Sequence, residues 1–223
     1  MNEHVSGDVA SNTTYVKQAY HHKDLRNALI DEALAILASE GSGELTLRGL
    51  ARRLGVTHTA PYAHFADKKA LLVAVADEGF ERLKEALKGA RDSTADLHER
   101  FVAQGLAYVR FARENPNLYR LMFVDPVLSK EPDCVVGGDD AFGILLETVS
   151  SLGISSETEI AYIGVAVWAS VHGVAMLEID ERLQHTIADH SGGFAPKSAA
   201  LPDGNDIVRL LSHTLLRGLQ AVP

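Results

Sequence analysis

The stretch TLRGLARRLGVTHTAPYAHFADKK, residues 46 to 69, decides the fold of this chain. Thr46 can cap a helix whose apolar residues recur at i, i+3, i+4 and i+7 on a single face, namely Leu47, Leu50, Ala51 and Leu54. Gly55 ends that helix, and Gly55 to Thr57 is a turn of the length found in helix-turn-helix units. Thr57 is a natural cap for a second helix, which the pattern predicts to run to about Phe65.

Positive charge is concentrated in the same stretch. Five basic residues face one acidic residue there, a net charge of +4, from Arg48, Arg52, Arg53, Lys68 and Lys69 against Asp67. The whole chain has a formal net charge of −9, so the remainder carries −13. This distribution argues against general binding of polyanions and favours one local surface for DNA phosphates. The second helix would then be the segment that reads the DNA groove.

The composition indicates an all-α protein without cysteine chemistry. The chain has 223 residues, 46% of them hydrophobic and 6% aromatic, and helical patterns outnumber strand-like runs. Cys134 is the only cysteine, so one chain can form no disulfide and no cysteine-based metal site. Its acidic neighbours disfavour a thiolate, which leaves an inert thiol as the main interpretation and redox sensing as the alternative.

Helical patterns continue along the rest of the chain. The first twenty residues lack periodicity and are expected to form a mobile arm, and a helix follows from Lys23 to Glu40 with Gly41 at its end. Asp67 can cap a fourth helix that runs to about Ala90. Further helices are predicted at 96–114, 117–123, 139–152, 157–179 and 205–220. Two segments look loose, at 125–138 and 180–205, and the second is either a lid or a disordered link.

One apolar segment is long enough to be considered as a membrane span. Residues 160–177 are 18 residues without a formal charge, near the lower limit of roughly 17 for a membrane span. The flanks are acidic and hold no nearby lysine or arginine that would orient a span. We therefore interpret the segment as a buried helix. The first twenty residues also lack the apolar core of a signal peptide, so a cytoplasmic location without membrane association is expected.

The motifs of common enzymes are absent from the sequence. It has no nucleophile elbow, no HExxH pair and no phosphate-binding glycine loop. We therefore expect no enzymatic activity, no cofactor and no metal.

Two motifs carry a resemblance to a known family. The run GVTHTAPYAHFADKKALL resembles the TetR family of bacterial transcriptional regulators, with seven positions in register: Gly55, Val56, Tyr62, His64, Phe65, Lys68 and Leu71. The later run VWASVHGVAML is similar to a subgroup of TetR C-terminal domains with a Trp–His–Gly signature, here Trp168, His172 and Gly173. The resemblance implies a three-helix DNA-binding head at 21–69, a connecting helix at 70–90 and a ligand-binding, dimerising body at 91–223.

The resemblance also implies a function and a set of DNA contacts. It implies a homodimeric repressor of double-stranded DNA that a small-molecule effector releases from an inverted-repeat operator. Phosphate contacts would come from Thr46, Thr57, Tyr62, His64 and Lys68, and base-edge contacts from His58, Thr59 and Ala60; Arg48 joins this set through its charge. Pro61 departs from the aliphatic residue that many members carry. The proline predicts a tight or irregular start to the second helix.

Several of these residues could have a structural role in place of a role in binding. Tyr62 either contacts phosphate or only packs, and His58 either contacts DNA or is a solvated cap residue. An aromatic and methionine cluster forms either core or the wall of an apolar pocket, through Tyr108, Phe111, Tyr119, Met122 and Phe123. A second set shares one helix face and forms either a dimer seam or a ligand contact, through Trp168, His172 and Met176. Such a pocket would suit an apolar or amphipathic effector.

A different class of function competes with this interpretation. The chain could be a helical small-molecule-binding or partner-interaction protein whose head no longer reads DNA. Pro61 and the acidic body favour that alternative. A steep salt dependence of binding to mixed DNA separates the two, because only a DNA reader releases counterions on binding.

Overall fold

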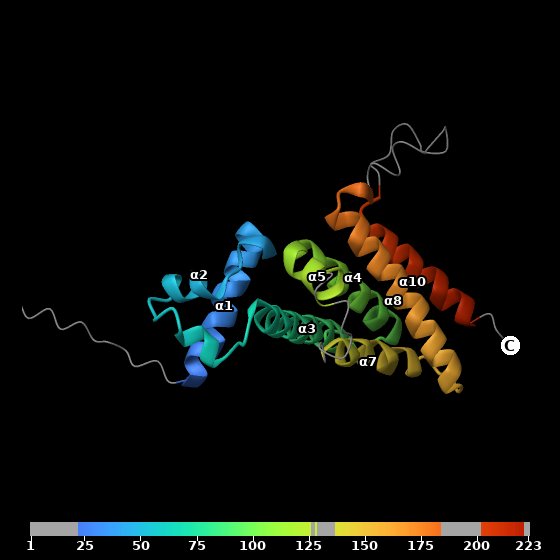
Figure 1. Ribbon diagram of the computed structural model, residues 1–223. Helices are drawn as coiled ribbons and strands as arrows, with labels where there is room; N and C mark the ends of the chain where they lie inside the picture. The colour runs from blue at the N-terminus through green and yellow to red at the C-terminus, as the bar shows by residue number, and fades with distance from the viewer. Residues whose placement is uncertain (1–21, 126–127, 129–136, 184–201, 221–223) are drawn as a thin grey trace, which may run out of the picture.

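Every regular element that this computed structural model describes is helical, over residues 22–125, 128, 137–183 and 202–220 (Figure 1). The longer helices are α1 (His22–Glu40), α2 (Leu47–Arg53), α3 (Lys68–Asp92), α4 (Leu97–Glu114), α5 (Pro116–Phe123), α7 (Gly137–Ser150), α8 (Glu157–Ile179) and α10 (Gly204–Gln220). The all-α fold predicted from the sequence is confirmed. The predicted arm at 1–20, Cys134 and most of the two loose segments lie outside the described residues.

The N-terminal head follows the predicted caps and turns. α1 ends at Glu40, followed by Gly41 at φ 82° and the short helix η1 (Ser42–Glu44). The Thr46 hydroxyl accepts a hydrogen bond from the Gly49 amide at 3.0 Å and caps α2. Gly55 has φ 67°, a left-handed conformation that glycine adopts without strain, and there the chain turns away from α2.

The second helix of the motif is shorter than the sequence predicts. In place of a helix from Thr57 to about Phe65, the structure has one turn of 3₁₀-helix, η2 (Ala60–Ala63), with Thr59 at its N-cap position and no side-chain cap. Pro61 lacks the amide proton that would start an α-helix from the Thr57 carbonyl. The Ala60 amide bonds that carbonyl instead at 3.0 Å. The effect of Pro61 therefore extends over the whole segment and is not confined to its beginning.

α3 leads from the head into the body (Figure 1). The Asp67 carboxylate accepts a hydrogen bond from the Ala70 amide at 2.8 Å, so the predicted cap is confirmed. The helix has 25 residues, a length of roughly 38 Å at 1.5 Å per residue. Its buried face contributes Leu71, Val75 and Leu83 to a core that is continuous between head and body.

The body is a bundle in which α4 is central. α3 packs against α4 and α7, α4 packs against α8 and α10, and α8 also contacts α7 and α10. Two glycines allow close approach. A Cβ on Gly105 of α4 would lie 2.8 Å from Val208 of α10, and a Cβ on Gly164 of α8 would overlap Leu146 of α7. The bundle therefore closes tightly at both points.

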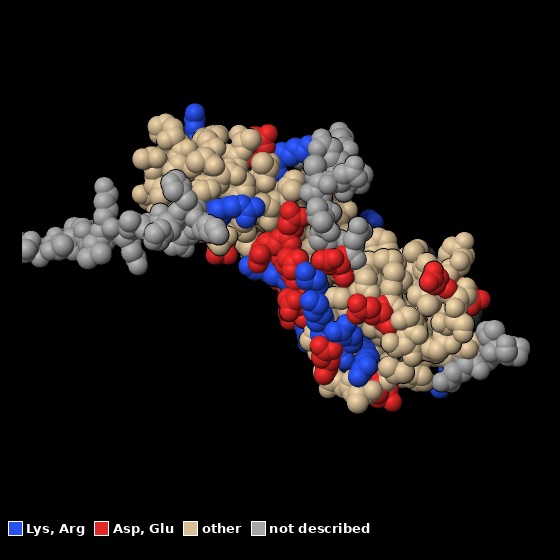
Figure 2. Space-filling view, turned by 90° about the horizontal axis from the view of Figure 1, so that it is seen from below, with Lys and Arg blue, Asp and Glu red and all other residues tan. Residues whose placement is uncertain are grey.

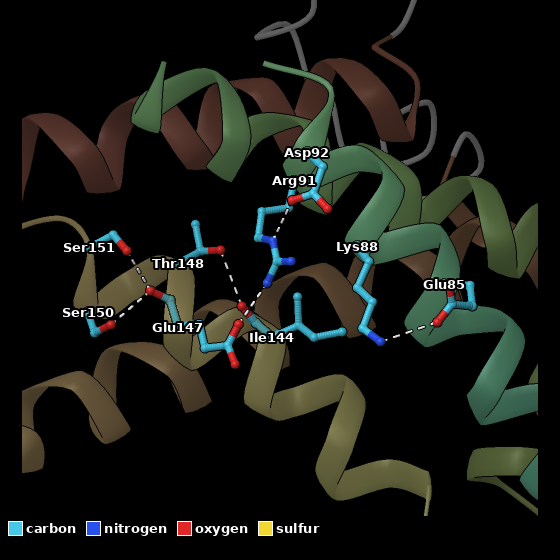
Figure 3. Close-up of polar contacts among 9 residues, drawn as sticks. All are labelled: Glu85, Lys88, Arg91, Asp92, Ile144, Glu147, Thr148, Ser150 and Ser151. Carbon is cyan, nitrogen blue, oxygen red and sulfur yellow. Dashed lines mark hydrogen bonds and ion pairs between the residues drawn. The ribbon is translucent and has the colours of Figure 1, made fainter. Parts of the chain in front are cut away.

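Charged residues cover the outer side of α3. Figure 2 shows acidic and basic side chains mixed in a band between the two ends of the molecule. Arg82 pairs with Glu78 at 2.8 Å on α3, and Arg91 reaches Glu147 of α7 at 2.7 Å (Figure 3). Exposed pairs of this kind contribute roughly 0–1 kcal/mol each. They keep this side solvated while the buried face holds the bundle together.

The prediction that the apolar segment 160–177 is buried is wrong. α8 has the predicted bounds, yet only four of its residues are buried, Gly164, Val171, Val174 and Ala175. By length and composition alone it is the one helix among the described residues that could cross a membrane, with a mean hydropathy of 1.8 and 22% of that window buried. Because apolar residues surround the whole helix, packing against three neighbours covers one side and leaves the other exposed.

Candidate nucleic-acid interface and ligand cavity

The turn and η2 present a polar surface above two buried side chains. Pro61 and Phe65 point into the head, and Phe65 is 3% exposed as expected of a core residue. Thr57, His58 and Thr59 lie exposed on the opposite side, and the Thr57 and Thr59 hydroxyls are 3.3 Å apart. Hydroxyls and an imidazole on one exposed turn can donate to phosphate oxygens or base edges.

Tyr62 is exposed on η2. It exposes 48% of its surface, so packing alone does not account for its place on η2. Ala60 and His64, the neighbouring predicted contacts, are half-buried. Arg48 is exposed on α2 and makes no ion pair with a described residue. Thr46 is exposed and accepts the capping bond, so its own proton remains available to an acceptor.

Two other basic residues of this region already have partners. The Lys68 ammonium donates to the backbone carbonyls of Ser42 at 2.8 Å and Gly43 at 3.4 Å. The Arg53 guanidinium pairs with Glu32 and Glu40 of α1. Lys68 therefore ties the start of α3 to η1, the short helix before α2. A phosphate contact would add to that role or replace it.

A second site is a cavity of about 410 Å³ inside the body. Six helices supply its wall: Phe80, Leu83 and Leu87 from α3; Phe101, Gln104, Gly105 and Tyr108 from α4; Phe123 from α5; Ala141, Phe142 and Leu145 from α7; Val165, Val167, Trp168 and Val171 from α8; and Ser212 from α10. The lining is mostly aliphatic and aromatic. Its size and character match sites for small organic ligands, which commonly measure roughly 300–1,000 Å³.

Only some of the residues predicted for this pocket line the cavity. Tyr108, Phe123 and Trp168 line the cavity. Phe111, Tyr119 and Met122 are core residues that do not line it, and half-buried Met176 packs against the same core. Most of the wall was missed, including Phe80, Phe101, Gln104, Phe142 and Ser212. These side chains share no local spacing, because they meet only when six separate helices pack.

His172 lies behind the cavity wall and bonds two tyrosines. Its Nδ1 atom is 2.7 Å from the Tyr119 hydroxyl and 3.0 Å from the Tyr108 hydroxyl, and the two hydroxyls are 3.1 Å apart. Burial raises the pKa of Tyr108 to about 12 and also raises the pKa of Tyr119, so both phenols keep their protons. Burial lowers the pKa of His172, which favours a neutral ring whose Nδ1 atom can accept a hydrogen bond from a phenol. The residue is thus a structural histidine that orients Tyr108.

The lowered pKa of His172 predicts a loss of stability in acid. The unfolded chain binds a proton at this residue before the folded protein does, so the free energy of unfolding decreases as pH falls below about 6.5. The contribution stays below about 1.4 kcal/mol per pH unit, the limit for one proton. We expect urea unfolding between pH 7 and 5 to show a smaller decrease for His172→Phe. An equal slope in both proteins would contradict this assignment.

A helix-turn-helix head joined to a helical body with an apolar cavity defines a class: DNA-binding regulators that respond to small molecules. Comparison with known proteins agrees. Residues 29–75 match the family model described as bacterial regulatory proteins, tetR family, and residues 101–196 match the tetracyclin repressor-like C-terminal domain. This chain belongs to the TetR family and is a transcriptional regulator. The family is one of regulators and not of enzymes.

Individual relatives extend the similarity over most of the chain. A protein of unknown function from Rhodococcus sp. RHA1 is 32% identical, and the match covers 91% of this chain and 98% of that one with a TM-score of 0.69. The TetR family regulator PfmR of Thermus thermophilus shares the fold at 20% identity, 86% and 98% coverage and a TM-score of 0.54. An uncharacterized helix-turn-helix-type regulator of Mycobacterium tuberculosis is 26% identical over 159 residues, 69% of this chain and 70% of the relative.

Proposed function

We propose that this protein is a homodimeric repressor that binds an inverted-repeat operator and leaves it when a small molecule occupies the body cavity. In this proposal residues 21–69 bind DNA, residues 70–90 connect, and residues 91–223 bind the effector and dimerise. The cytoplasm is the compartment in which such a regulator would work. The observation that carries the proposal is that two helices lining the cavity also contact the head.

α5 is the shorter of these two links. Phe123 near its end lines the cavity, and Asn117 near its start donates to the backbone carbonyls of Leu37 at 2.9 Å and Ala38 at 3.4 Å. Those carbonyls belong to the last turn of α1, where the Leu37 carbonyl also accepts from the Gly41 amide at 3.2 Å. A ligand that shifts Phe123 would therefore move the partner of α1.

α3 is the longer link. Phe80, Leu83 and Leu87 line the cavity, and the same helix begins at Lys68, directly after η2 and its following turn. Displacement of the α3 side chains would reach the head through a continuous helix. An effector shifts the equilibrium only if it binds the DNA-releasing conformation more tightly than the DNA-bound one. α3 and α5 each line the cavity and contact the head, which supports that coupling.

The exposed side of α8 and α10 supports the dimer. Tyr162 is 72% exposed and Val165 50% exposed on α8, and Leu210 is 67% exposed on α10, which packs beside α8. Large apolar side chains exposed on two neighbouring helices support an interface there. We propose that a second copy covers it, with the two η2 segments in successive major grooves roughly 34–36 Å apart.

Selection of bound genomic DNA tests the DNA-reading function. Sheared genomic DNA of the source organism is incubated at moderate salt with wild-type protein, Arg48→Ala, His58→Ala and a control, Arg110→Ala, which removes an exposed cation of the body. We expect wild type and control to recover one inverted repeat. Arg48→Ala should weaken binding to all sequences and lower the salt slope by about one per protomer, while His58→Ala should change the sequence preference.

Two results would contradict the proposal. Wild-type protein that enriches no sequence, with a flat salt dependence on mixed DNA, would favour the helical binding protein that no longer reads DNA. Equal enrichment by wild type and both head variants would place the DNA-binding surface elsewhere on the molecule.

A further inference from the structure

Gln104 is an exception in the apolar cavity. Its side chain lines the cavity from α4 and is 4% exposed, yet neither its amide nitrogen nor its amide oxygen has a hydrogen-bond partner among the described residues. Leaving a buried polar group unpaired costs roughly 1–3 kcal/mol, so a buried amide of this kind usually serves a specific purpose. The amide can donate and accept at once.

The other polar groups at the wall differ from Gln104. The Tyr108 hydroxyl already has Tyr119 and His172 within hydrogen-bond distance. Trp168 carries its indole N–H on the side of Tyr108, and Ser212 adds one buried hydroxyl from α10. Gln104 is therefore the side chain of the wall whose amide nitrogen and amide oxygen both lack a hydrogen-bond partner among the described residues.

Charge defines what that molecule can be. No Lys, Arg, His, Asp or Glu is present among the described residues that line the cavity. An ionised carboxylate or ammonium moved into such a site loses its hydration and finds no opposite charge, which is strongly unfavourable. A neutral polar group loses much less hydration free energy, and hydrogen bonds to Gln104 can replace its bonds to water.

We propose that the cavity binds a neutral molecule with an apolar body and one amide, carbonyl or hydroxyl group held by Gln104. The proposal rests on the function proposed above where it treats this molecule as the effector. Binding of the molecule to the cavity does not itself depend on DNA. The aromatic and aliphatic wall of α3, α7 and α8 takes the apolar body, and the two hydrogen-bonding atoms of Gln104 select the polar end. Gln104 is thus a specificity-determining residue.

Three probes with the same tail separate the headgroups. Decanamide, decanoate and decylammonium differ in whether the polar end is neutral, negative or positive. Trp168 is the only tryptophan of the chain and lines the cavity, so its fluorescence reports occupancy in the full-length protein without DNA. We expect decanamide to bind at least about tenfold more tightly than either charged probe at pH 7.

Two Gln104 variants and one control sharpen the test. Gln104→Leu should weaken decanamide binding about tenfold, and Gln104→Glu should shift the preference to decylammonium. The control, Thr148→Val, alters a buried hydroxyl that bonds the Ile144 carbonyl within α7 and does not line the cavity, so it should change none of the three affinities.

The outcomes separate this proposal from the proposed function. Equal affinity for the three probes, or decanamide binding unaffected by both Gln104 variants, would overturn the role of Gln104 while the DNA selection remains valid. Headgroup preference that follows Gln104 supports the ligand class even if decanamide leaves DNA binding unchanged. In that case the failure would belong to release from the operator and not to recognition in the cavity.

Discussion

Leu210→Glu is expected to convert the protein from a dimer to a monomer. Leu210 is 67% exposed on α10, beside the exposed apolar side of α8. In a two-fold interface each substitution is present once in each protomer, so the dimer would bury two uncompensated charges. Tyr162→Glu, at the 72% exposed position on α8, should act in the same way.

Operator affinity should fall together with the dimer. A monomer carries one reading segment, and loss of the second converts a bivalent contact into a single one, which weakens binding by roughly 100-fold or more. Sedimentation at several protein concentrations measures the oligomeric state, and binding to the selected inverted repeat measures the affinity.

Val124→Glu provides the matched control for this experiment. Val124 is also apolar and 48% exposed, but it is the C-cap residue of α5 and belongs to neither α8 nor α10. It should leave both the dimer and the operator affinity unchanged. Folded Leu210→Glu and Tyr162→Glu proteins that remain dimeric would place the interface on another face.

Tyr119→Ala should cause the largest loss of stability. Tyr119 is fully buried, its ring lies 4.8 Å from that of Phe123 and 5.5 Å from that of His172, and its hydroxyl bonds both Tyr108 and His172. Truncation leaves a cavity and unpaired polar atoms, for which losses of about 3–5 kcal/mol are typical. Tyr119→Phe should cost only about 0.5–1.5 kcal/mol, because Tyr108 and His172 remain 3.0 Å apart.

Urea unfolding at one fixed protomer concentration measures these differences, since dimerisation makes stability depend on concentration. Tyr62→Ala makes the same chemical change at an exposed tyrosine and should cost under about 1 kcal/mol. A loss for Tyr119→Ala no greater than for Tyr62→Ala would show that the cluster around His172 does not stabilise the body.

Local signals explain why the helix boundaries could be predicted. A cap acts within four residues, so Thr46 and Asp67 identify the starts of α2 and α3 without reference to the rest of the fold. Gly41 and Gly55 likewise identify their turns, because both adopt positive φ. The TetR assignment depended on the same short segment.

Features that depend on long-range packing could not be predicted in this way. The side of α8 that packs against the bundle could not be predicted, since its apolar residues surround the helix and carry no direction. The cavity depends on six helices, so Gln104 appeared in the sequence as one more polar residue of α4. The length of η2 depends on Pro61, which predicts an irregular start of the helix but limits the whole segment to one turn of 3₁₀-helix.

The lining of the cavity determines whether ligand binding there is coupled to protonation. Among the described residues that line it, Tyr108 is the one with an ionisable side chain, and its pKa of about 12 keeps it neutral at every pH a living cell reaches. A neutral ligand in a neutral site takes up and releases no protons. Binding of the proposed neutral ligand would therefore exchange no proton with the lining itself, and occupancy of the cavity would follow the supply of that ligand.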